Sequence, residues 1–360
     1  MKHSLSAAAA ATLLAVSGAS HALTFNFTFV AGTSAQAQQA FIDAGNRWSA
    51  LFTDNVTLNM TVGQSSLGAG ILASTGSART AFSYTQFRGA LAADATSGTD
   101  AQAVASLPTG SSFGMLINRT SDNPNGAGSA TAYLDNNGSA NNSTVRITNA
   151  NALALGLTPT AQVVGSCTSA CDASIVFGNA FSWDYNPADG ITAGAYDFVG
   201  IATHELGHAL GFVSGVDILD INSPNPTTPG PFSADQFTFV SSVDLFRYST
   251  ASTAQGVIDW TASTADKYFS LDRGATAIAA LSTGRIFGDG QQNSHWKDDL
   301  GLGIMDPTAA RGELLAISAN DRTGFDAIGW NLAPIPEPST YALFGLGLLG
   351  LALRRRQLRG

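Results

Sequence analysis

The chain has 360 residues, with 17 Lys and Arg against 26 Asp and Glu and a formal net charge of −9. Five of the basic residues and one of the acidic residues lie in two terminal segments, residues 1–22 and 336–360, which leaves 12 basic and 25 acidic residues between them. An acidic body without a clustered basic stretch argues against a nucleic-acid-binding protein. Residues 23–335 are numerous enough to bury the core of one large domain or of two subdomains.

The first 22 residues are predicted to be a secretory signal peptide. Lys2 and His3 give a cationic start, residues 7–16 form an apolar core, and Ser20-His21-Ala22 is a small-x-small cleavage site before Leu23. We therefore expect the mature chain outside the cytoplasm.

Two strands and a helix are predicted next. Residues 23–30 and 56–62 alternate apolar and polar side chains, as half-buried strands do. Between them, residues 35–52 carry apolar side chains at helical spacing. The following stretch, residues 63–151, is rich in Ser, Thr, Gly and Ala, so we predict loops and short elements there.

One part of this stretch could bind calcium, but the sequence does not support a calcium site there. Asp135-Asn136-Asn137-Gly138 resembles the start of a calcium loop. An EF-hand would need glycine at its sixth position and glutamate at its twelfth, where this chain has Ala140 and Arg146. A plain turn is the better prediction.

The two cysteines, Cys167 and Cys171, are expected to form a small disulfide loop because the protein is predicted to be exported. The first alternative is a metal site, but this pair would need two further ligands nearby, and the sequence has none there. The second is a regulatory thiol that blocks a zinc site, and nothing in the flanking residues supports it. A compact β-favouring run at 173–177 predicts another strand.

The motif His204-Glu205-x-x-His208 carries most of the chemical information. Asp197 is placed to cap a helix that runs to about Leu210, and Gly211 stands where that helix should end in a left-handed conformation. On a helix, two histidines four residues apart lie on one face and can bind a single zinc ion. The intervening glutamate can then act as general base on a water molecule held by the metal.

His295 is the leading candidate for a third zinc ligand. The chain has five histidines, and two of them lie in the predicted leader. Since a catalytic zinc typically takes three protein ligands and leaves a fourth position open, one catalytic Zn²⁺ would use all three that remain. The alternative is that His295 is a surface residue in a polar loop.

Other third ligands fit less well. Glu313 is the only glutamate after the motif in the predicted mature chain, and it lacks the partner pattern of thermolysin-like enzymes. The position ten residues after the first histidine, which is a ligand in the commonest metzincin arrangement, is Ser214. Asp217 and Asp220 are close but wrongly spaced, and we expect them to be loop acids or to support the ligands.

The rest of the mature chain is predicted to be an insertion followed by a short C-terminal part. Residues 213–292 are rich in Pro, Ser, Thr and Asp and contain three strand-like pieces, at 237–240, 244–248 and 268–271. After His295, residues 303–307 predict a tight turn, and residues 318–328 predict a final amphipathic helix.

The C-terminal tail resembles the PEP-CTERM sorting signal of Gram-negative bacteria. It combines Pro336-Glu337-Pro338, an apolar run at 341–353 and an arginine cluster at 354–359. The run is shorter than the roughly 20 residues of a full membrane span, and the arginines would stay on the cytoplasmic side. The resemblance implies removal by an exosortase-type enzyme after transient insertion in the inner membrane. A permanent anchor is the alternative.

The order of the motifs also resembles the leishmanolysin group of metzincin zinc proteases. In that group the third histidine is displaced by an insertion and precedes a methionine turn, as Ser294-His295-Trp296-Lys297 and Ile304-Met305-Asp306-Pro307 do here. The similarity covers residues 197–212 and 293–330. It implies that His204, His208 and His295 bind zinc above Met305, and that the strand at 173–177 lines the cleft as an edge for an extended peptide.

The resemblance also implies an α+β fold. A twisted mixed sheet and the active-site helix would form an N-terminal subdomain, and the methionine turn and the final helix an irregular C-terminal one. Two features depart from the group: its cysteine-rich framework is absent, and Asp306 stands where some metzincins have a tyrosine, so no side chain is obvious for holding the oxyanion.

Together these features predict a secreted or cell-surface zinc metalloendopeptidase that cleaves protein or peptide substrates. The expected parts are a signal peptide (1–22), an N-terminal catalytic subdomain (23–212), an insertion (213–292), a C-terminal catalytic subdomain (293–335) and the sorting tail (336–360). A surface or matrix protein with a catalytically silent zinc site, or an envelope hydrolase acting on non-peptide amides, are the alternatives.

Overall fold

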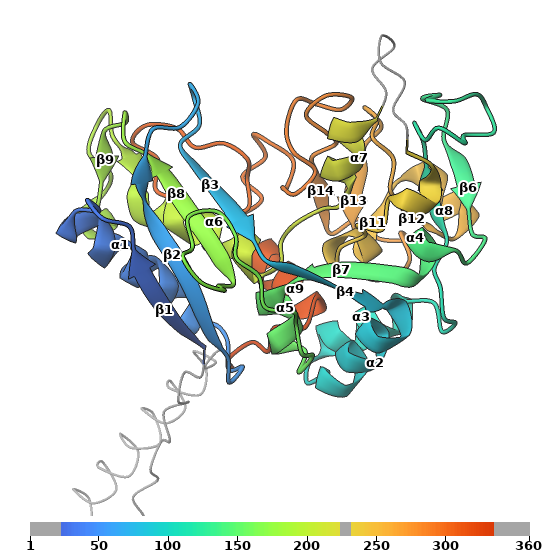
Figure 1. Ribbon diagram of the computed structural model, residues 1–360, viewed down its shortest axis with the longest axis horizontal. Helices are drawn as coiled ribbons and strands as arrows, with labels where there is room; N and C mark the ends of the chain where they lie inside the picture. The colour runs from blue at the N-terminus through green and yellow to red at the C-terminus, as the bar shows by residue number, and fades with distance from the viewer. Residues whose placement is uncertain (1–22, 224–231, 335–360) are drawn as a thin grey trace, which may run out of the picture.

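The computed structural model describes residues 23–223 and 232–334, so the predicted signal peptide (1–22) and the predicted sorting tail (336–360) lie outside the described residues. These residues form an α+β structure with several small sheets (Figure 1). The largest sheet has four strands in the order β1-β2-β8-β3. They are β1 (Thr24–Phe29), β2 (Thr57–Ser65), β3 (Ala73–Ser77) and β8 (Ala173–Gly178).

This sheet is mixed, as predicted. β1, β2 and β8 run parallel, and β3 pairs antiparallel with β8 at one edge. The strands predicted at 23–30, 56–62 and 173–177 are confirmed. Strand β3 was not predicted because its residues, Ala-Ser-Thr-Gly-Ser, have no large apolar side chain to produce an alternating pattern.

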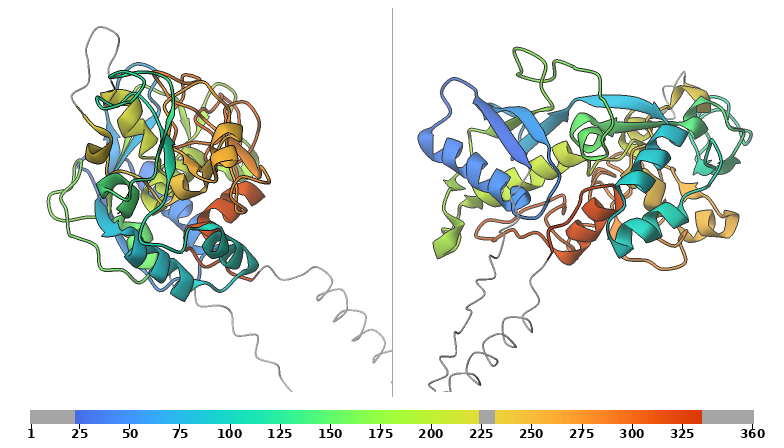
Figure 2. Two further views of the ribbon diagram at one scale, coloured as in Figure 1. Left: turned by 90° about the vertical axis from the view of Figure 1, so that its right-hand side faces the viewer. Right: turned by 90° about the horizontal axis from the view of Figure 1, so that it is seen from below.

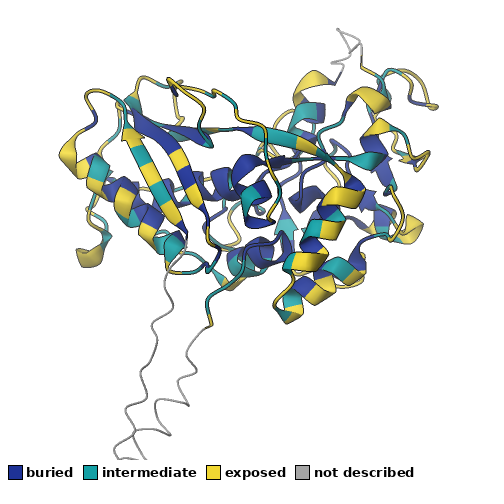
Figure 3. Ribbon diagram, turned by 60° about the horizontal axis from the view of Figure 1, so that its bottom comes forward, coloured by how far each residue is buried: buried dark blue, intermediate teal, exposed yellow. Residues whose placement is uncertain are grey.

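Two helices cover one face of the sheet (Figure 2). Helix α1 (Ala35–Ser49) is buried along one side and exposed along the other (Figure 3), and helix α6 (Phe198–Leu210) is buried almost throughout. Phe41 of α1 packs edge-on against the rings of Phe177 and Phe198, at 5.2 and 5.1 Å between centroids. The indole N–H of Trp48 donates to the carbonyl of Thr203 at 2.9 Å, which fastens α1 directly to α6.

The stretch at 63–151 is more regular than predicted. Its further elements are β4 (Arg79–Ser83), α2 (Tyr84–Asp94), α3 (Gly98–Ser106), β5 (Met115–Ile117), β6 (Tyr133–Asp135), α4 (Ala140–Ser143), β7 (Thr144–Thr148) and α5 (Asn149–Ala154). Capping boxes start α2 and α3, with Ser83 paired to Gln86 and Ser97 to Asp100. Such boxes satisfy free amides at a helix start, and they were the sequence signal for these two helices.

The insertion forms short elements that pack into the preceding part of the chain. They are α7 (Val216–Asn222), η2 (Ala234–Gln236), η3 (Val243–Phe246), β11 (Arg247–Tyr248), α8 (Thr250–Gln255), β12 (Ile258–Asp259), β13 (Lys267–Phe269) and β14 (Ala279–Leu281). β12 pairs parallel with β5, and β13 lies between β11 and β14.

Of the three strands predicted in the insertion, only the one near 268–271 has a close counterpart, β13. Residues 237–240 form no strand, and 244–248 is a 3₁₀ turn followed by the two residues of β11. The apolar side chains of Phe237 and Val240 are nonetheless buried. They point into the core from irregular backbone, which periodicity alone does not distinguish from a strand.

Smaller elements complete the described structure. β9 (Trp183–Asp184) pairs with β10 (Tyr196–Asp197), η1 (Pro187–Asp189) lies between them, and Cys167 and Cys171 are joined by a disulfide just before β8. The final helix is α9 (Ala319–Ala327), within the range predicted for it. Among the described residues, no helix is both long and apolar enough to cross a bilayer.

Candidate metal centre

Helix α6 carries the first two histidines of the centre. Asp197 caps its start by accepting a hydrogen bond from the backbone N–H of Gly200 at 2.7 Å. The helix ends at Leu210, and Gly211 follows with φ of 127°. An added Cβ at Gly211 would lie 3.0 Å from the side chain of Asn151, so both its backbone conformation and its surroundings favour glycine.

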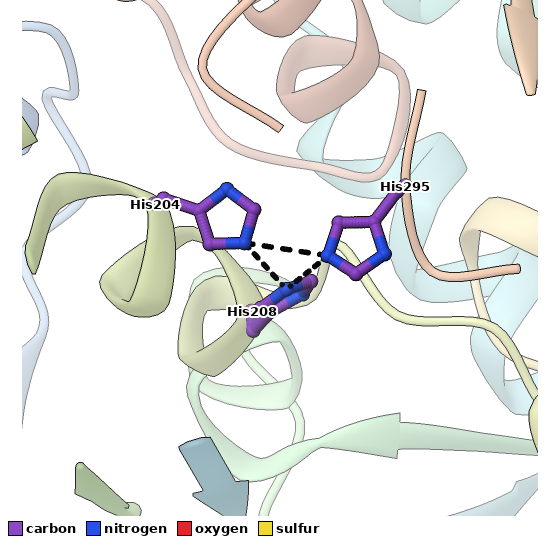
Figure 4. A group of neighbouring side chains, drawn as sticks. All are labelled: His204, His208 and His295. Carbon is purple, nitrogen blue, oxygen red and sulfur yellow. Dashed lines mark hydrogen bonds between the residues drawn. The ribbon is translucent and has the colours of Figure 1, made fainter. Parts of the chain in front are cut away.

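The three histidines come together where α6 faces the segment that carries His295 (Figure 4). The Nε2 atom of His208 lies 3.0 Å from that of His204 and 3.1 Å from that of His295, and the third separation is 3.3 Å. Nitrogens bound tetrahedrally to one zinc at about 2.1 Å would be separated by about 3.4 Å. The three-histidine cluster could therefore hold a metal ion.

Hydrogen bonds to the far side of each ring fix its tautomer. Nδ1–H of His204 donates to the carbonyl of Ile304 and Nδ1–H of His208 to that of Phe212, both at 2.7 Å. Nδ1–H of His295 donates to the carbonyl of Gln292 at 3.2 Å. Because a carbonyl only accepts, each neutral ring carries its proton on Nδ1, and three bare Nε2 lone pairs converge.

Burial keeps these rings neutral. It lowers the pKa of His204 to about 4 and that of His295 to about 3, and it lowers the pKa of His208 well below its usual value. Neutral imidazole is the form that ligates a metal. The donor set and its protonation state both fit zinc.

His295 lies on a turn that hydrogen bonds hold in place. Its carbonyl accepts from the backbone N–H of Ser282 at 3.1 Å, next to β14. On the other side, the carboxylate of Asp217 in α7 accepts from the backbone N–H of Asn293 at 2.6 Å and from the hydroxyl of Ser294. Asp217 thus supports a candidate ligand from outside the cluster, one of the two roles expected from its spacing.

Asp220, on the same helix, supports a neighbouring segment. Its carboxylate accepts from the backbone N–H groups of Ile286 and Phe287 at 2.8 and 3.0 Å. Neither Asp217 nor Asp220 belongs to the cluster that could hold a metal.

Met305 lies beneath the helix. An added Cβ on Gly207 would be 2.4 Å from the Met305 sulfur, so the methionine packs directly against the helix turn between His204 and His208. Met305 is fully buried. Its side chain is therefore an apolar neighbour of the helix turn that carries both histidines.

Asp321, the third residue of α9, is a supporting residue that the sequence analysis missed. Its carboxylate accepts from the indole N–H of Trp296 at 2.8 Å and from the backbone N–H of Ile304 and Ser318 at 2.7 and 2.6 Å. It thereby joins the residue after His295 to the turn before Met305. The capping pattern of Ser318 with Asp321 could have marked the residue as a helix cap, but not as a partner of distant segments.

Glu205 is buried beside the cluster and held by Thr75 of β3. The Thr75 hydroxyl donates to Oε2 of Glu205 at 2.6 Å. Burial raises the pKa of Glu205 to about 7, against the smaller lowering effect of this hydrogen bond. A carboxyl group with a pKa near neutrality can both accept and return a proton at physiological pH.

Two cavities adjoin the cluster, and both are lined by Glu205 and His295. One, of about 350 Å³, is reached by His204, and its lining includes the apolar side chains of Leu72, Tyr196, Ile201, Ile304 and Leu315. The other, of about 610 Å³, is reached by His208 and lined by more polar groups, among them Arg79 and Arg285. Residues of β3 line both cavities.

One expectation about this cleft was wrong. The strand at 173–177 does not form its edge, because β8 is paired on both sides, with β2 and with β3. The edge strand is β3, which was not predicted.

Asp306 follows Met305, at the position where some metzincins have a tyrosine. It lines the 350 Å³ cavity. Burial raises the pKa of Asp306 to about 6.

Fold and site together define an α+β protein with a candidate three-histidine metal centre. Comparison with protein families adds the sorting signal: residues 334–356 match the PEP-CTERM protein-sorting motif. This motif implies an exported, cell-surface protein that is processed by exosortase. No curated protein and no solved structure matches the chain.

Proposed function

We propose that this protein is a secreted zinc-dependent metalloendopeptidase. The observation that carries the proposal is the convergence of three Nε2 atoms within 3.3 Å, each on a ring whose Nδ1–H is bonded to a carbonyl, beside a buried carboxyl group. A purely structural zinc site needs four protein ligands, whereas three leave a position open. In the described residues, no fourth histidine, cysteine or acidic ligand joins the cluster.

His204, His208 and His295 would hold the zinc ion, which when bound supplies Lewis acidity to a water molecule and to the substrate carbonyl. Glu205 acts as the general base: its carboxylate takes a proton from the attacking water and passes it to the leaving amine. Thr75 keeps the carboxylate oriented during both transfers. Because Glu205 is buried, its proton affinity is close to that of a base working at neutral pH.

Strand β3 is the proposed docking edge for the substrate. Its partner β8 occupies one side only, so the other side offers backbone N–H and C=O groups to an extended peptide. Thr75 lies in the middle of this strand and contacts Glu205, which places the strand's centre at the reacting group. We infer that residues 213–292 are an insertion between the helix ligands and the third ligand, and that 23–212 and 293–335 supply the two catalytic subdomains.

The direct test compares wild type with Glu205→Gln, which keeps the size of the side chain and removes its basicity. We expect equal zinc content in the two proteins and a loss of casein cleavage of about 10² to 10⁴-fold. The matched control is Glu313→Gln, a change in an exposed glutamate that only accepts a hydrogen bond from Ala310. It should leave cleavage unchanged.

Undiminished cleavage by a zinc-loaded Glu205→Gln protein would refute the mechanism. A wild type that binds zinc stoichiometrically but cuts no protein or peptide would instead favour a catalytically silent site. Release of amine from non-peptide amides alone would favour the envelope hydrolase.

A further inference from the structure

Two arginines line the 610 Å³ cavity on the His208 side without an internal partner. Within residues 23–223 and 232–334, neither Arg79 nor Arg285 donates a side-chain hydrogen bond, and neither belongs to an ion pair. The carboxylate of Asp217 lines the same cavity, but its oxygens accept hydrogen bonds from Asn293 and Ser294. Burial lowers the pKa of Arg79, and the charges of Asp217 and Asp244 oppose this effect. Neither carboxylate forms an ion pair with Arg79 in the described residues, so the N–H donors of both guanidinium groups are available to a ligand.

Most of the other arginines are used differently. Six of those described donate to backbone carbonyls: Arg47, Arg119, Arg146, Arg247, Arg273 and Arg311. In a chain with net charge −9, two unused guanidinium groups in one cavity beside the candidate centre are the chemistry that binds an anion.

The direction of β3 indicates where on a peptide this anion would be. The strand starts at Ala73, which lines both cavities, passes Glu205 at Thr75, and continues along the 610 Å³ cavity to Arg79, the first residue of β4. A peptide added antiparallel to β3 would therefore place its N-terminal side near Arg79. At about 3.3 Å per residue, Arg79 is roughly 13 Å along the strand from Thr75. It nevertheless lines the same cavity as Glu205 and His208.

We propose that Arg79 and Arg285 form a subsite for a carboxylate side chain of the substrate, about two to four residues N-terminal to the scissile bond. This proposal rests on the proposed peptidase function. It makes the enzyme selective for acidic segments, although the protein itself is acidic.

Binding tests the subsite without hydrolysis. The full chain carrying Glu205→Gln, loaded with zinc, is titrated with fluorescent peptides that differ at one position only. Each carries Glu, Gln or Lys at the second, third or fourth position before the scissile bond, or at the second position after it. We expect about tenfold tighter binding of a Glu peptide, the effect of charge-assisted hydrogen bonds. Adding Arg79→Gln should bring the Glu-to-Gln ratio close to one, and Arg79→Glu should shift the preference to a Lys peptide.

The control is Arg88→Gln, since Arg88 also donates no side-chain hydrogen bond among the described residues but lines neither cavity. This variant should preserve the preference for the Glu peptide.

Cleavage rates of the same peptides by wild type separate the subsite proposal from the proposed peptidase function. Cleavage with equal rates and equal affinities for Glu and Gln peptides would overturn the subsite alone. No cleavage of any peptide would overturn the proposed function, and the subsite with it. A preference only for Glu after the scissile bond would overturn the antiparallel placement.

Discussion

Helix α6 supplies His204 and His208 from adjacent turns, whereas His295 comes from a turn segment between β14 and α9. The helix fixes the spacing of its two ligands by its own hydrogen bonds, since residues four apart share a face. The turn has no such internal repeat. Its position depends on the carboxylates of Asp217 and Asp321, which come from two other helices.

The comparison teaches that one half of the centre is determined locally and the other by long-range contacts. The two halves also meet: Ile304, which precedes Met305, accepts the Nδ1–H of His204. A change in the turn region can therefore disturb the orientation of the His204 ring. The backbone of helix α6, in contrast, is held by its own hydrogen bonds and cap. The following predictions test this asymmetry, from the largest expected effect to the smallest.

Removal of either kind of ligand should abolish tight metal binding equally. We expect His208→Ala and His295→Ala each to lower zinc affinity by more than about 100-fold, because even the outer partners of a ligand contribute 10 to 100-fold. Competition with a chromogenic chelator measures this. If His295→Ala kept wild-type affinity, the turn segment would not belong to the centre.

Asp321→Asn should damage the turn side specifically. The amide removes one acceptor oxygen from a carboxylate that binds Trp296, Ile304 and Ser318, so we expect zinc affinity to fall by about 10 to 100-fold. The matched control is Asp326→Asn in the same helix, where the carboxylate accepts from Ser97 and touches neither histidine segment. Equal losses in the two variants would mean that α9 matters only for stability.

Asp217→Asn should have a smaller effect of the same kind. Asp217 holds Asn293 and Ser294 but not the methionine turn, so we expect about a tenfold loss of zinc affinity. Asp220→Asn is the comparison on the same helix, because Asp220 holds the backbone of Ile286 and Phe287 instead. In a zinc titration, Asp217→Asn should bind zinc more weakly than Asp220→Asn. The reverse order would contradict the role of Asp217 in holding the segment of His295.

The pH dependence of the metal-free protein should report how deeply the turn ligand is buried. Burial lowers the pKa of His295 to about 3, while the unfolded chain titrates near 6.5. Between these values the unfolded state binds more protons, so His295 costs stability as the pH falls below 6.5. Measured with EDTA and urea, the free energy of unfolding of wild type relative to His295→Gln should decline over this window, by at most about tenfold in the equilibrium constant per pH unit. A constant difference would mean that His295 is solvated in the metal-free fold.

Patterns of local origin were predicted correctly from the sequence. Helix α6 with its cap at Asp197 and its end at Gly211 follows from residues that interact within a few positions of one another. The same holds for α1, α9 and the apolar strands of the main sheet. Spacing also gave His204 and His208 one common face, and the count of histidines pointed to His295.

Other features depended on contacts that no local pattern encodes. The edge strand β3 has small polar residues and becomes a strand because β8 offers it a hydrogen-bonding partner. Asp321 serves as a cap in its own sequence context, and only the fold brings Trp296 and Ile304 to its carboxylate. The sequence by itself therefore determined the identity of the proposed ligands and the helix that carries two of them. The tertiary structure alone decided how the third approaches, which strand borders the cleft and which arginines face it, because these depend on hydrogen bonds between residues far apart in the chain.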